Sequence, residues 1–380
     1  MAQRLKTDWI LFATVLAMMS FGVLIIYSAS SVMAKMDPHY GSSWHFVIRQ
    51  LEAAAVAVVV MMTLKKTDYH KFHSPAVAFG AIGIALMLLG VVYFVDSAHH
   101  RWLLGGTIQP SELAKPALVL FVAFFVTWRA RAINSARYTL VPAALAVGLV
   151  IFAVVIPDLG TAAVLGATAM IVFFVAGLQF RYCFIVAGIA LLGLIVSIFA
   201  EPYRLGRVIK FFDPDFKFIS KFDPQGKLKA RTELTLRTRD TNYQLEQSQI
   251  AVGEGGPGGL GLMNGRQKLL YLPEAHTDFI YAVVGEELGL IGTIGLLLGF
   301  AVIFWRGLRA TLRMRDDFGR YLALGETVVV VVQGFINMSV VLGMVPTKGI
   351  PLPMISYGGS SLLSTLALLG ILMNVSEHAG

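Results

Sequence analysis

Charged residues are scarce in this sequence of 380 residues. Asp, Glu, Lys and Arg make up only 14% of it, while 56% of the residues are hydrophobic and the mean hydropathy is +0.71. Soluble domains carry about 25% charged residues. A soluble core of this length has no use for so much apolar surface. The composition therefore excludes a soluble globular protein and predicts an all-α membrane protein that crosses the bilayer many times.

Cysteine is almost absent. The single residue, Cys183, cannot form an intramolecular disulfide, and a lone cysteine at the start of an apolar run is no evidence of a redox function. Internal repeats are also lacking, as is any stretch typical of a separate soluble domain. We therefore expect a single transmembrane domain over residues 1–380.

Long apolar runs dominate what the sequence does contain. Each approaches the ~20 residues that an α-helix needs to cross about 30 Å of hydrocarbon. They predict ten membrane spans, at residues 9–31, 46–64, 76–95, 112–128, 139–156, 161–178, 182–200, 278–305, 321–345 and 359–376.

Basic residues are distributed unevenly over the predicted loops. Cytoplasmic loops of membrane proteins are enriched in Lys and Arg. With the N-terminus inside, the short outside loops hold only Lys35, Arg101 and Lys348, whereas the cytoplasmic segments hold Arg4, Lys6, Lys65, Lys66, Lys71, Arg129, Arg131, Arg137, Arg181, Arg306, Arg309, Arg313, Arg315 and Arg320. Both termini are therefore predicted to be cytoplasmic. The formal charge of +8 is mostly a sign of this topology and does not indicate nucleic-acid binding.

One extracytoplasmic loop, residues 201–277, is much longer than the others. Loops of more than about 15 residues are usually functional or contain structure of their own. We expect a short hairpin near 232–238, within the charged segment 213–240, and a helix at 243–252. A glycine run at 253–258 matches GxGxxG, but no strand precedes it and Pro257 interrupts it, so flexible turns are a better interpretation than a nucleotide site.

The most informative stretch is 272–292, where a Pro-Glu-Ala-His-Thr-Asp turn runs into an apolar helix. Asp278 lies at that junction. A carboxylate where a membrane helix meets water costs solvation energy and usually has a function and a partner. At 100° per residue, Asp278 shares a helix face with small residues, which predicts close packing on protein; the face comprises Ala282, Gly285, Gly289 and Gly292. Helix capping by Asp278 is the alternative.

The neighbours of Asp278 leave other interpretations open. His276 and Asp278 are too close in sequence to form a catalytic triad with the residue between them. Metal ligation by His276 with Asp278 or Glu274 stays open, although no second histidine is nearby. Glu286 and Glu287 lie deeper in the same helix, where at least one must be buried against a partner, and we interpret both as structural.

A second polar cluster surrounds the start of the fourth span. Arg101 precedes it, and Pro110 is a good first residue for the helix. Glu112 and Lys115 are three residues apart and share one helix face, so they can form a simple intrahelical ion pair. Lys115 lies a turn inside the apolar run, where a cation is costly unless it is paired or functional. A place in a binding site is therefore the second interpretation.

Three further polar features lie at the same outer face. Asp158 stands in the short turn between the fifth and sixth spans, either as a helix cap or as a site residue. Arg49 lies near the outer end of the second span and can extend to the lipid headgroups. Segment 346–361 holds three prolines and Ser356, and non-helical backbone at this depth must be buried in protein or line a polar cavity. Together the clusters predict an outward-open cavity for an amphiphile with an anionic headgroup, such as a lipid pyrophosphate.

Five segments resemble the signature segments of the SEDS family (shape, elongation, division and sporulation), which comprises the FtsW and RodA proteins. They are RWLLGGTIQPSELAK, PDLGTA, YQLEQSQIAVGEGG, NGRQKLLYLPEAHTDFIYAVVGEELGLIG and PTKGIPLPMISYGGSSLL. The fourth and fifth are more similar to the division type, FtsW, than to the elongation type. The resemblance extends from the first span to the last.

The resemblance implies a peptidoglycan glycosyltransferase of the bacterial cytoplasmic (inner) membrane. It implies that lipid II, an undecaprenyl-pyrophosphate-linked disaccharide peptide, is polymerised at the outer face with a class B penicillin-binding protein and other divisome or elongasome proteins as partners. Asp278 is implied as the catalytic residue. The candidate substrate-binding residues are Arg49, Arg101, Glu112, Lys115, Asp158, Gln247, Ser248, His276 and Ser356. A divalent cation, Mg²⁺ or Mn²⁺, is a candidate cofactor.

Three other functions compete with this one. A RodA-like polymerase of cell elongation has the same chemistry. A lipid II flippase has the same cavity without chemistry, but predicts polar residues continuing to the inner face and inverted repeats. A membrane scaffold that only recruits a transpeptidase leaves Lys115 and Asp278 without a physical reason.

Overall fold

The computed structural model describes residues 7–36, 40–96, 100–103, 106–200, 202–213, 241–269, 271–346 and 349–379, and these are mostly helical. The helices are α1 (Trp9–Met36), α2 (His45–Lys66), η1 (Tyr69–Phe72), α3 (Pro75–Val95), α4 (Pro110–Trp128), η2 (Ala130–Ala132), η3 (Ala136–Leu140), α5 (Val141–Val155), α6 (Leu159–Val175), α7 (Phe180–Ala200), α8 (Pro202–Phe212), α11 (Thr241–Gly255), α12 (Ile280–Arg313), α13 (Asp317–Val341) and α14 (Gly359–His378).

Each of the ten predicted spans corresponds to a described helix. Nine described helices are long and apolar enough to cross a membrane, η3 and α5 together forming one of them; the tenth, α6, has 17 residues. The all-α polytopic fold is thus confirmed, and the chain is an integral membrane protein. The predicted bounds are wrong mainly for the eighth span, because α12 begins at Ile280, after Asp278, and continues to Arg313.

Local sequence explains where several helices begin. Pro75 and Pro110 occupy the first helical positions of α3 and α4, where a missing N–H leaves no hydrogen bond unmade. The carboxylates of Asp158 and Asp316 accept backbone N–H groups at the starts of α6 and α13. Asp158 and Asp316 are therefore the N-terminal caps of these two helices.

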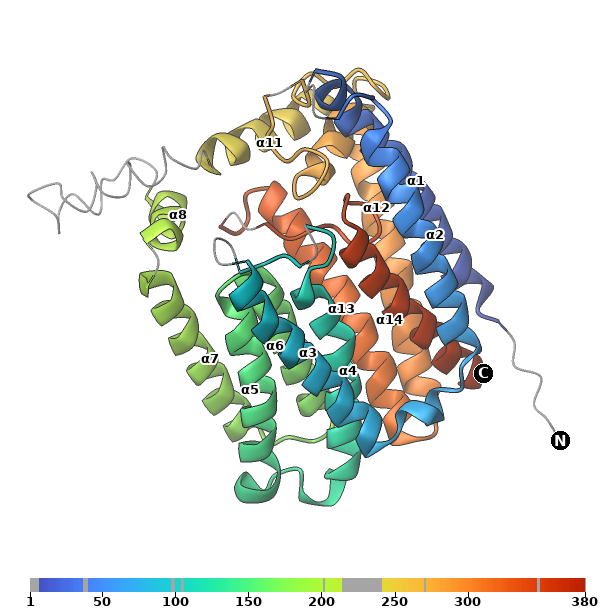
Figure 1. Cartoon of the computed structure of the whole chain (residues 1–380), viewed down its shortest axis with the longest axis vertical. Helices are drawn as coiled ribbons and strands as arrows, with labels where there is room; N and C mark the ends of the chain where they lie inside the picture. Colours follow the sequence, from blue (N-terminus) through green and yellow to red (C-terminus); the bar gives the residue numbers. More distant parts are fainter. Residues whose placement is uncertain are drawn as a thin grey trace, which may run out of the picture.

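Three helices form the centre of the bundle. Most residues in the apolar windows of α4, α13 and α14 are buried, whereas α7 buries only Ser197 along its length. Figure 1 shows α13 and α14 in the middle of the bundle, α1 and α2 on one side, and α3, α5, α6 and α7 on the other. The exposed faces of the outer helices carry large apolar side chains, as expected for contact with lipid.

The start of α1 and the end of α14 lie at the same end of the bundle (Figure 1). Asp8, just before α1, accepts hydrogen bonds from Arg306 of α12 and Ser376 of α14. At the same end Lys65 pairs with Glu377 at 2.7 Å. These interactions join helices far apart in the sequence at the end that carries most of the basic loops.

The opposite end is covered by α11 and by the turns of 256–279. Gly289 of α12 has φ of 61°, and a Cβ there would lie 2.4 Å from the backbone N of Gly259. The small-residue face of α12 therefore packs against α11 and the glycine run, which confirms the predicted close packing. The predicted hairpin at 232–238 and most of the charged segment lie outside the described residues.

Two buried glutamates fasten these turns to α12. The carboxylate of Glu287 accepts hydrogen bonds from Lys268 and, at 2.6 Å, from Ser28 of α1. Glu286 accepts the backbone N–H groups of Arg266 and Gln267. The prediction that at least one of the two glutamates is buried against a partner is confirmed.

We expect Lys268→Met to destabilise the protein strongly, because Glu287 would be left in a buried site without its cation. Breaking a buried ion pair from one side costs on the order of 3–5 kcal/mol. Arg320→Met is the matched control, since its pair with Asp317 is exposed and such pairs contribute at most about 1 kcal/mol. Thermal unfolding in detergent measures both. Equal unfolding temperatures for the two variants would contradict this role of Lys268.

Candidate active site

A cavity of about 2450 Å³ opens in the part of the bundle near α11 and the turn before α12. Small-molecule pockets usually measure about 300–1,000 Å³, so this cavity is large enough for an extended substrate. Its described polar lining comes from eight parts of the chain. The charged and imidazole groups that line it are His45, Arg49, Glu52, His100, Arg101, Asp158, Arg204, Arg207, Glu274, His276 and Asp278.

Asp278 lies in the turn that leads into α12. Its backbone carbonyl accepts a hydrogen bond from Asn337 Nδ2 at 2.8 Å. Its carboxylate lies against Gly349, where a Cβ would stand 2.6 Å from Oδ2. Asp278 is half-buried and lines the cavity. The backbone is thus held by protein, while the carboxylate faces the cavity.

The surroundings of Asp278 favour the neutral carboxyl. Burial raises the pKa of Asp278 to about 7. The positive charge of Arg101 opposes this shift, the negative charges of Glu274 and Asp158 add to it, and Arg207 again lowers the pKa. A carboxyl with a pKa near 7 is suited to accept a proton at neutral pH.

His276 is buried and packed between aromatic rings. Its ring centroid lies 4.6 Å from that of Phe46 and 5.6 Å from that of Tyr357. Burial lowers the pKa of His276, and the charge of Glu274 opposes this only in part. His276 lines the cavity as a neutral side chain whose packing supports the turn before Asp278.

The donor set of this turn does not fit a metal. No group of three or more His, Cys, Asp or Glu among the described residues could hold a metal ion. Of the predicted ligands, Glu274 instead accepts a hydrogen bond from Thr277 Oγ1 at 2.7 Å. The divalent cation stays a prediction.

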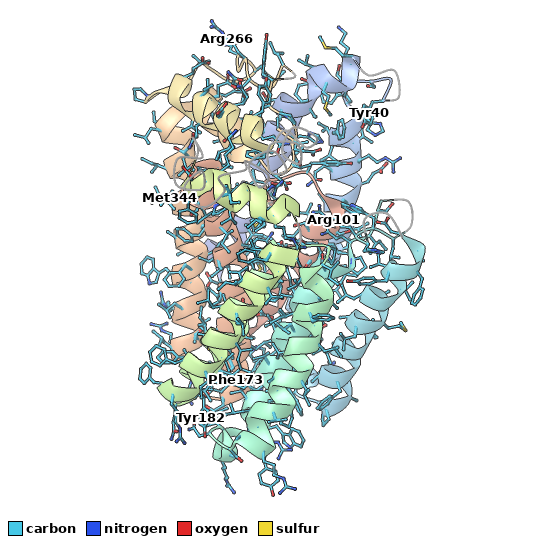
Figure 2. All side chains as sticks on the ribbon, turned by 90° about the vertical axis from the view of Figure 1, so that its left-hand side faces the viewer. Tyr40, Arg101, Phe173, Tyr182, Arg266 and Met344 are labelled. Atoms are coloured by element: carbon cyan, nitrogen blue, oxygen red, sulfur yellow. The ribbon has the colours of Figure 1, made fainter. Side chains whose placement is uncertain are left out.

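Arg101 is held on the cavity by its loop. The Asp96 carboxylate accepts the backbone N–H groups of Arg101 and Trp102, each at 3.1 Å. The guanidinium lies 5.7 Å from the ring centroid of Trp102. Figure 2 shows Arg101 below the level of Arg266 and Tyr40 along the bundle.

Asp158 and Arg49 also line the cavity. The Asp158 carboxylate caps α6, since it accepts the N–H of Thr161 at 3.0 Å and its hydroxyl at 2.7 Å. The helix cap predicted for Asp158 is therefore confirmed, and its role as a site residue stays a prediction. Arg49 is exposed on α2, and its charge acts on Tyr357.

Glu112 and Lys115 do not line the cavity. Lys115 is 1% exposed, and its Nζ lies 2.7 Å from both carboxylate oxygens of Glu112. The intrahelical ion pair, which the sequence left as an alternative, is what the structure contains. The expectation that Lys115 faces the cavity with Asp278 is wrong, because its charge is already compensated inside the protein.

Three other predicted residues also lie off the cavity. The buried Ser248 of α11 hydrogen-bonds to the carbonyls of Leu245 and Val341, and Gln247 is half-buried on the same helix. Ser356 donates to the carbonyl of Thr277 at 2.6 Å. Ser356 therefore joins segment 349–358 to the turn that carries Asp278.

Sequence reasoning missed the arginines of α8. Arg204 donates to the carbonyls of Val155 at 3.0 Å and Ile156 at 2.8 Å, so α8 lies against the C-terminal end of α5. Arg207, one turn later, lines the cavity and lowers the pKa of Asp278. The sequence signal is two arginines three residues apart in an amphipathic helix, which does not by itself show that the helix lies on the cavity.

A family model described as "Cell cycle protein", which covers the FtsW, RodA and SpoVE proteins, matches residues 8–380. The chain belongs to this family. It is 35% identical to stage V sporulation protein E of Bacillus subtilis (strain 168), over 99% of each chain. It is 36% identical to the probable peptidoglycan glycosyltransferase FtsW of Geobacter sp. (strain M18), over 98% of this chain and 97% of the relative.

Solved structures show the same fold. A chain of the structure "Structural coordination of polymerization and crosslinking by a peptidoglycan synthase complex" is 28% identical, with a TM-score of 0.73 over 99% of both chains. The rod shape determining protein RodA of Thermus thermophilus is 26% identical, with a TM-score of 0.65 over 98% of this chain and 97% of that one.

Gly349→Ala should displace the carboxylate of Asp278, because the added methyl group would overlap Oδ2. A misplacement of about 1 Å can cost ~100-fold in rate. We expect a loss of that order in the initial rate of peptidoglycan glycan synthesis, the activity for which the FtsW relatives are named.

Gly83→Ala in α3 is the matched control, since its Cβ meets nothing within 4 Å. It should leave the rate unchanged. Wild-type rates in both variants would show that the Gly349 contact does not position Asp278.

Proposed function

We propose that this chain is a peptidoglycan glycosyltransferase that polymerises lipid II into β1,4-linked glycan strands and releases undecaprenyl pyrophosphate. The observation that carries the proposal is the Asp278 carboxylate, which faces a large cavity beside arginine side chains. Relatives named probable peptidoglycan glycosyltransferase FtsW are similar over nearly the whole chain, which supports the same activity.

The cavity suits both halves of a lipid pyrophosphate. Its apolar wall includes Leu194 and Ile198 of α7 and Phe335 of α13, whose helices also face the lipid region. Its polar wall carries Arg101 and Arg207. A polyprenyl chain can lie along the apolar wall while the pyrophosphate meets the arginines, because guanidinium groups bind phosphate oxygens in bidentate fashion.

The reaction needs one base and a stabilised leaving group. The C4 hydroxyl of the acceptor N-acetylglucosamine gives its proton to Asp278 as its oxygen attacks the anomeric carbon of the lipid-linked donor, a form of base catalysis worth ~10²–10⁴ in rate. The bond from that carbon to the pyrophosphate oxygen breaks with its electron pair. Arg101 and Arg207, which line the cavity, stabilise the charge that develops. Direct attack inverts an α-linked donor to a β1,4 bond.

The distribution of basic residues favours one orientation of the cavity in the membrane. This distribution supports a topology with both termini in the cytoplasm and the cavity at the outer face of the bacterial inner membrane. The described lining residues come from loops, from α8 and α11, and from the halves of the spanning helices nearest to them, with Val56 just beyond the middle of α2. This one-sided cavity favours a polymerase over a flippase, which needs a polar path through to the inner face.

A class B penicillin-binding protein is the partner that we propose. One similar solved chain belongs to a peptidoglycan synthase complex of polymerization and crosslinking. We assign the chain to cell division, because several relatives at 36% identity are FtsW proteins. A role in sporulation is the second candidate, supported by the similarity to stage V sporulation protein E.

Asp278→Asn tests the proposal most simply. The exchange is nearly isosteric and removes only the base, so we expect purified protein with its partner to make no glycan polymer from labelled lipid II. Thermal unfolding and partner binding should match wild type. Near-wild-type polymer from the mutant would refute the role of Asp278, and a wild type that makes no polymer would refute the activity.

The pH profile offers a second test. Because Asp278 must be deprotonated to accept a proton and its pKa is about 7, the rate should rise with pH below about 7 and level off above it. Glu274→Gln removes a negative charge that raises this pKa, so its midpoint should move to lower pH. A midpoint near 4 in the wild type, or no movement in Glu274→Gln, would contradict the assignment.

A further inference from the structure

The buried ion pair of α4 extends beyond its two members. Lys115 Nζ donates to the carboxylate of Glu112 and, at 2.6 Å, to Oε1 of Gln333 on α13. Gln333 is 1% exposed. An ammonium group that donates to an amide oxygen polarises the whole amide and strengthens the hydrogen bonds that its N–H groups donate.

Two amides on one face of α13 continue this chain of hydrogen bonds. Gln333 Nε2 donates to the carbonyl of Pro351 at 2.8 Å. Asn337, one turn further and also 1% exposed, donates from Nδ2 to the carbonyl of Ile350 at 2.7 Å and to that of Asp278 at 2.8 Å. Consecutive carbonyls of one non-helical segment are thus bonded to consecutive turns of one helix.

The segment held in this way touches the reacting carboxylate. Residues 349–352 have no regular secondary structure, and Gly349 lies against Asp278 Oδ2. Non-helical backbone at membrane depth needs hydrogen-bond partners from the protein. Gln333 and Asn337 supply these hydrogen-bond partners. Asn337 donates to the carbonyls of both Asp278 and Ile350, so one side chain joins the turn before α12 to segment 349–352.

We propose that Gln333 and Asn337 are positioning residues for Asp278, and that the Glu112–Lys115 pair acts on the reaction through them instead of through contact with substrate. The inference rests on the proposed function, since positioning matters to a rate only if Asp278 is the base. Lys115 and Glu112 are buried and cannot touch substrate, but they can still influence the reaction through Gln333.

A structural role alone would look different from positioning. Loss of either amide should lower kcat by ~100-fold, the usual effect of a misplacement of about 1 Å, with the KM for lipid II unchanged because neither side chain lines the cavity. A residue that binds pyrophosphate would instead raise KM. A purely structural residue would lower the amount of folded protein and leave both constants as they were.

The test uses Gln333→Met and Asn337→Leu in the full-length protein in nanodiscs. Asn374→Leu is the matched control, because Asn374 is a buried amide of α14 that joins Tyr69 and Lys65 at the inner end. The readouts are kcat and KM for lipid II, the pH midpoint, and hydrogen exchange of the amides in 277–280 and 349–352. We expect lower kcat, unchanged KM, a shifted pH midpoint and faster exchange in both variants, and none of these changes in Asn374→Leu.

Several results would overturn the proposal. They are wild-type kcat with wild-type exchange in Gln333→Met, a change confined to KM, and the same changes in Asn374→Leu. If Gln333→Met does not fold, Gln333→Glu replaces it, since the carboxylate keeps an acceptor for Lys115 and loses the donor to Pro351. A wild type without polymerase activity would refute the proposed function alone, because hydrogen exchange still tests whether the amides hold the segment.

Discussion

The cost of holding a carboxylate away from water governs the arrangement of this site. Asp278 lies where the protein covers it in part, so burial favours its neutral form and brings the pKa to about 7. A fully hydrated carboxylate would be a much weaker base, and one fully compensated by arginine would not take a proton. The opposing charges of Arg101 and Glu274 keep Asp278 between these limits.

The same cost explains why two buried lysines of the bundle are each paired with a glutamate. Lys115 with Glu112 and Lys268 with Glu287 are almost fully buried, and each cation also donates to a further side chain. Such pairs contribute little net stability, but the loss of one member is expensive, so they impose one arrangement on the segments that they join. The pair at Lys268 fixes the turns before Asp278 to α1 and α12. The pair at Lys115 is connected through Gln333 to segment 349–352, which contacts Asp278.

The fold could be predicted from the sequence because hydropathy over about 20 residues is a strong signal. The site was predictable in part. Asp278, Arg101 and Asp158 were found because a charge at the end of an apolar run is unusual, and all three line the cavity. Lys115 was misplaced, because helical spacing shows which residues share a face but not which neighbour covers that face. Arg207 was missed because local sequence does not show that α8 returns to the cavity.

The central claim is that lipid II reacts in this cavity with Asp278 as base, and a structure of the Asp278→Asn variant with bound lipid II tests it most directly. The account predicts a pyrophosphate against Arg101 and Arg207 and an acceptor C4 hydroxyl within hydrogen-bond reach, about 3 Å, of the side chain at position 278. The lipid would lie along α7 and α13. A pyrophosphate bound outside the cavity, or sugars bound beyond the reach of position 278, would contradict the account.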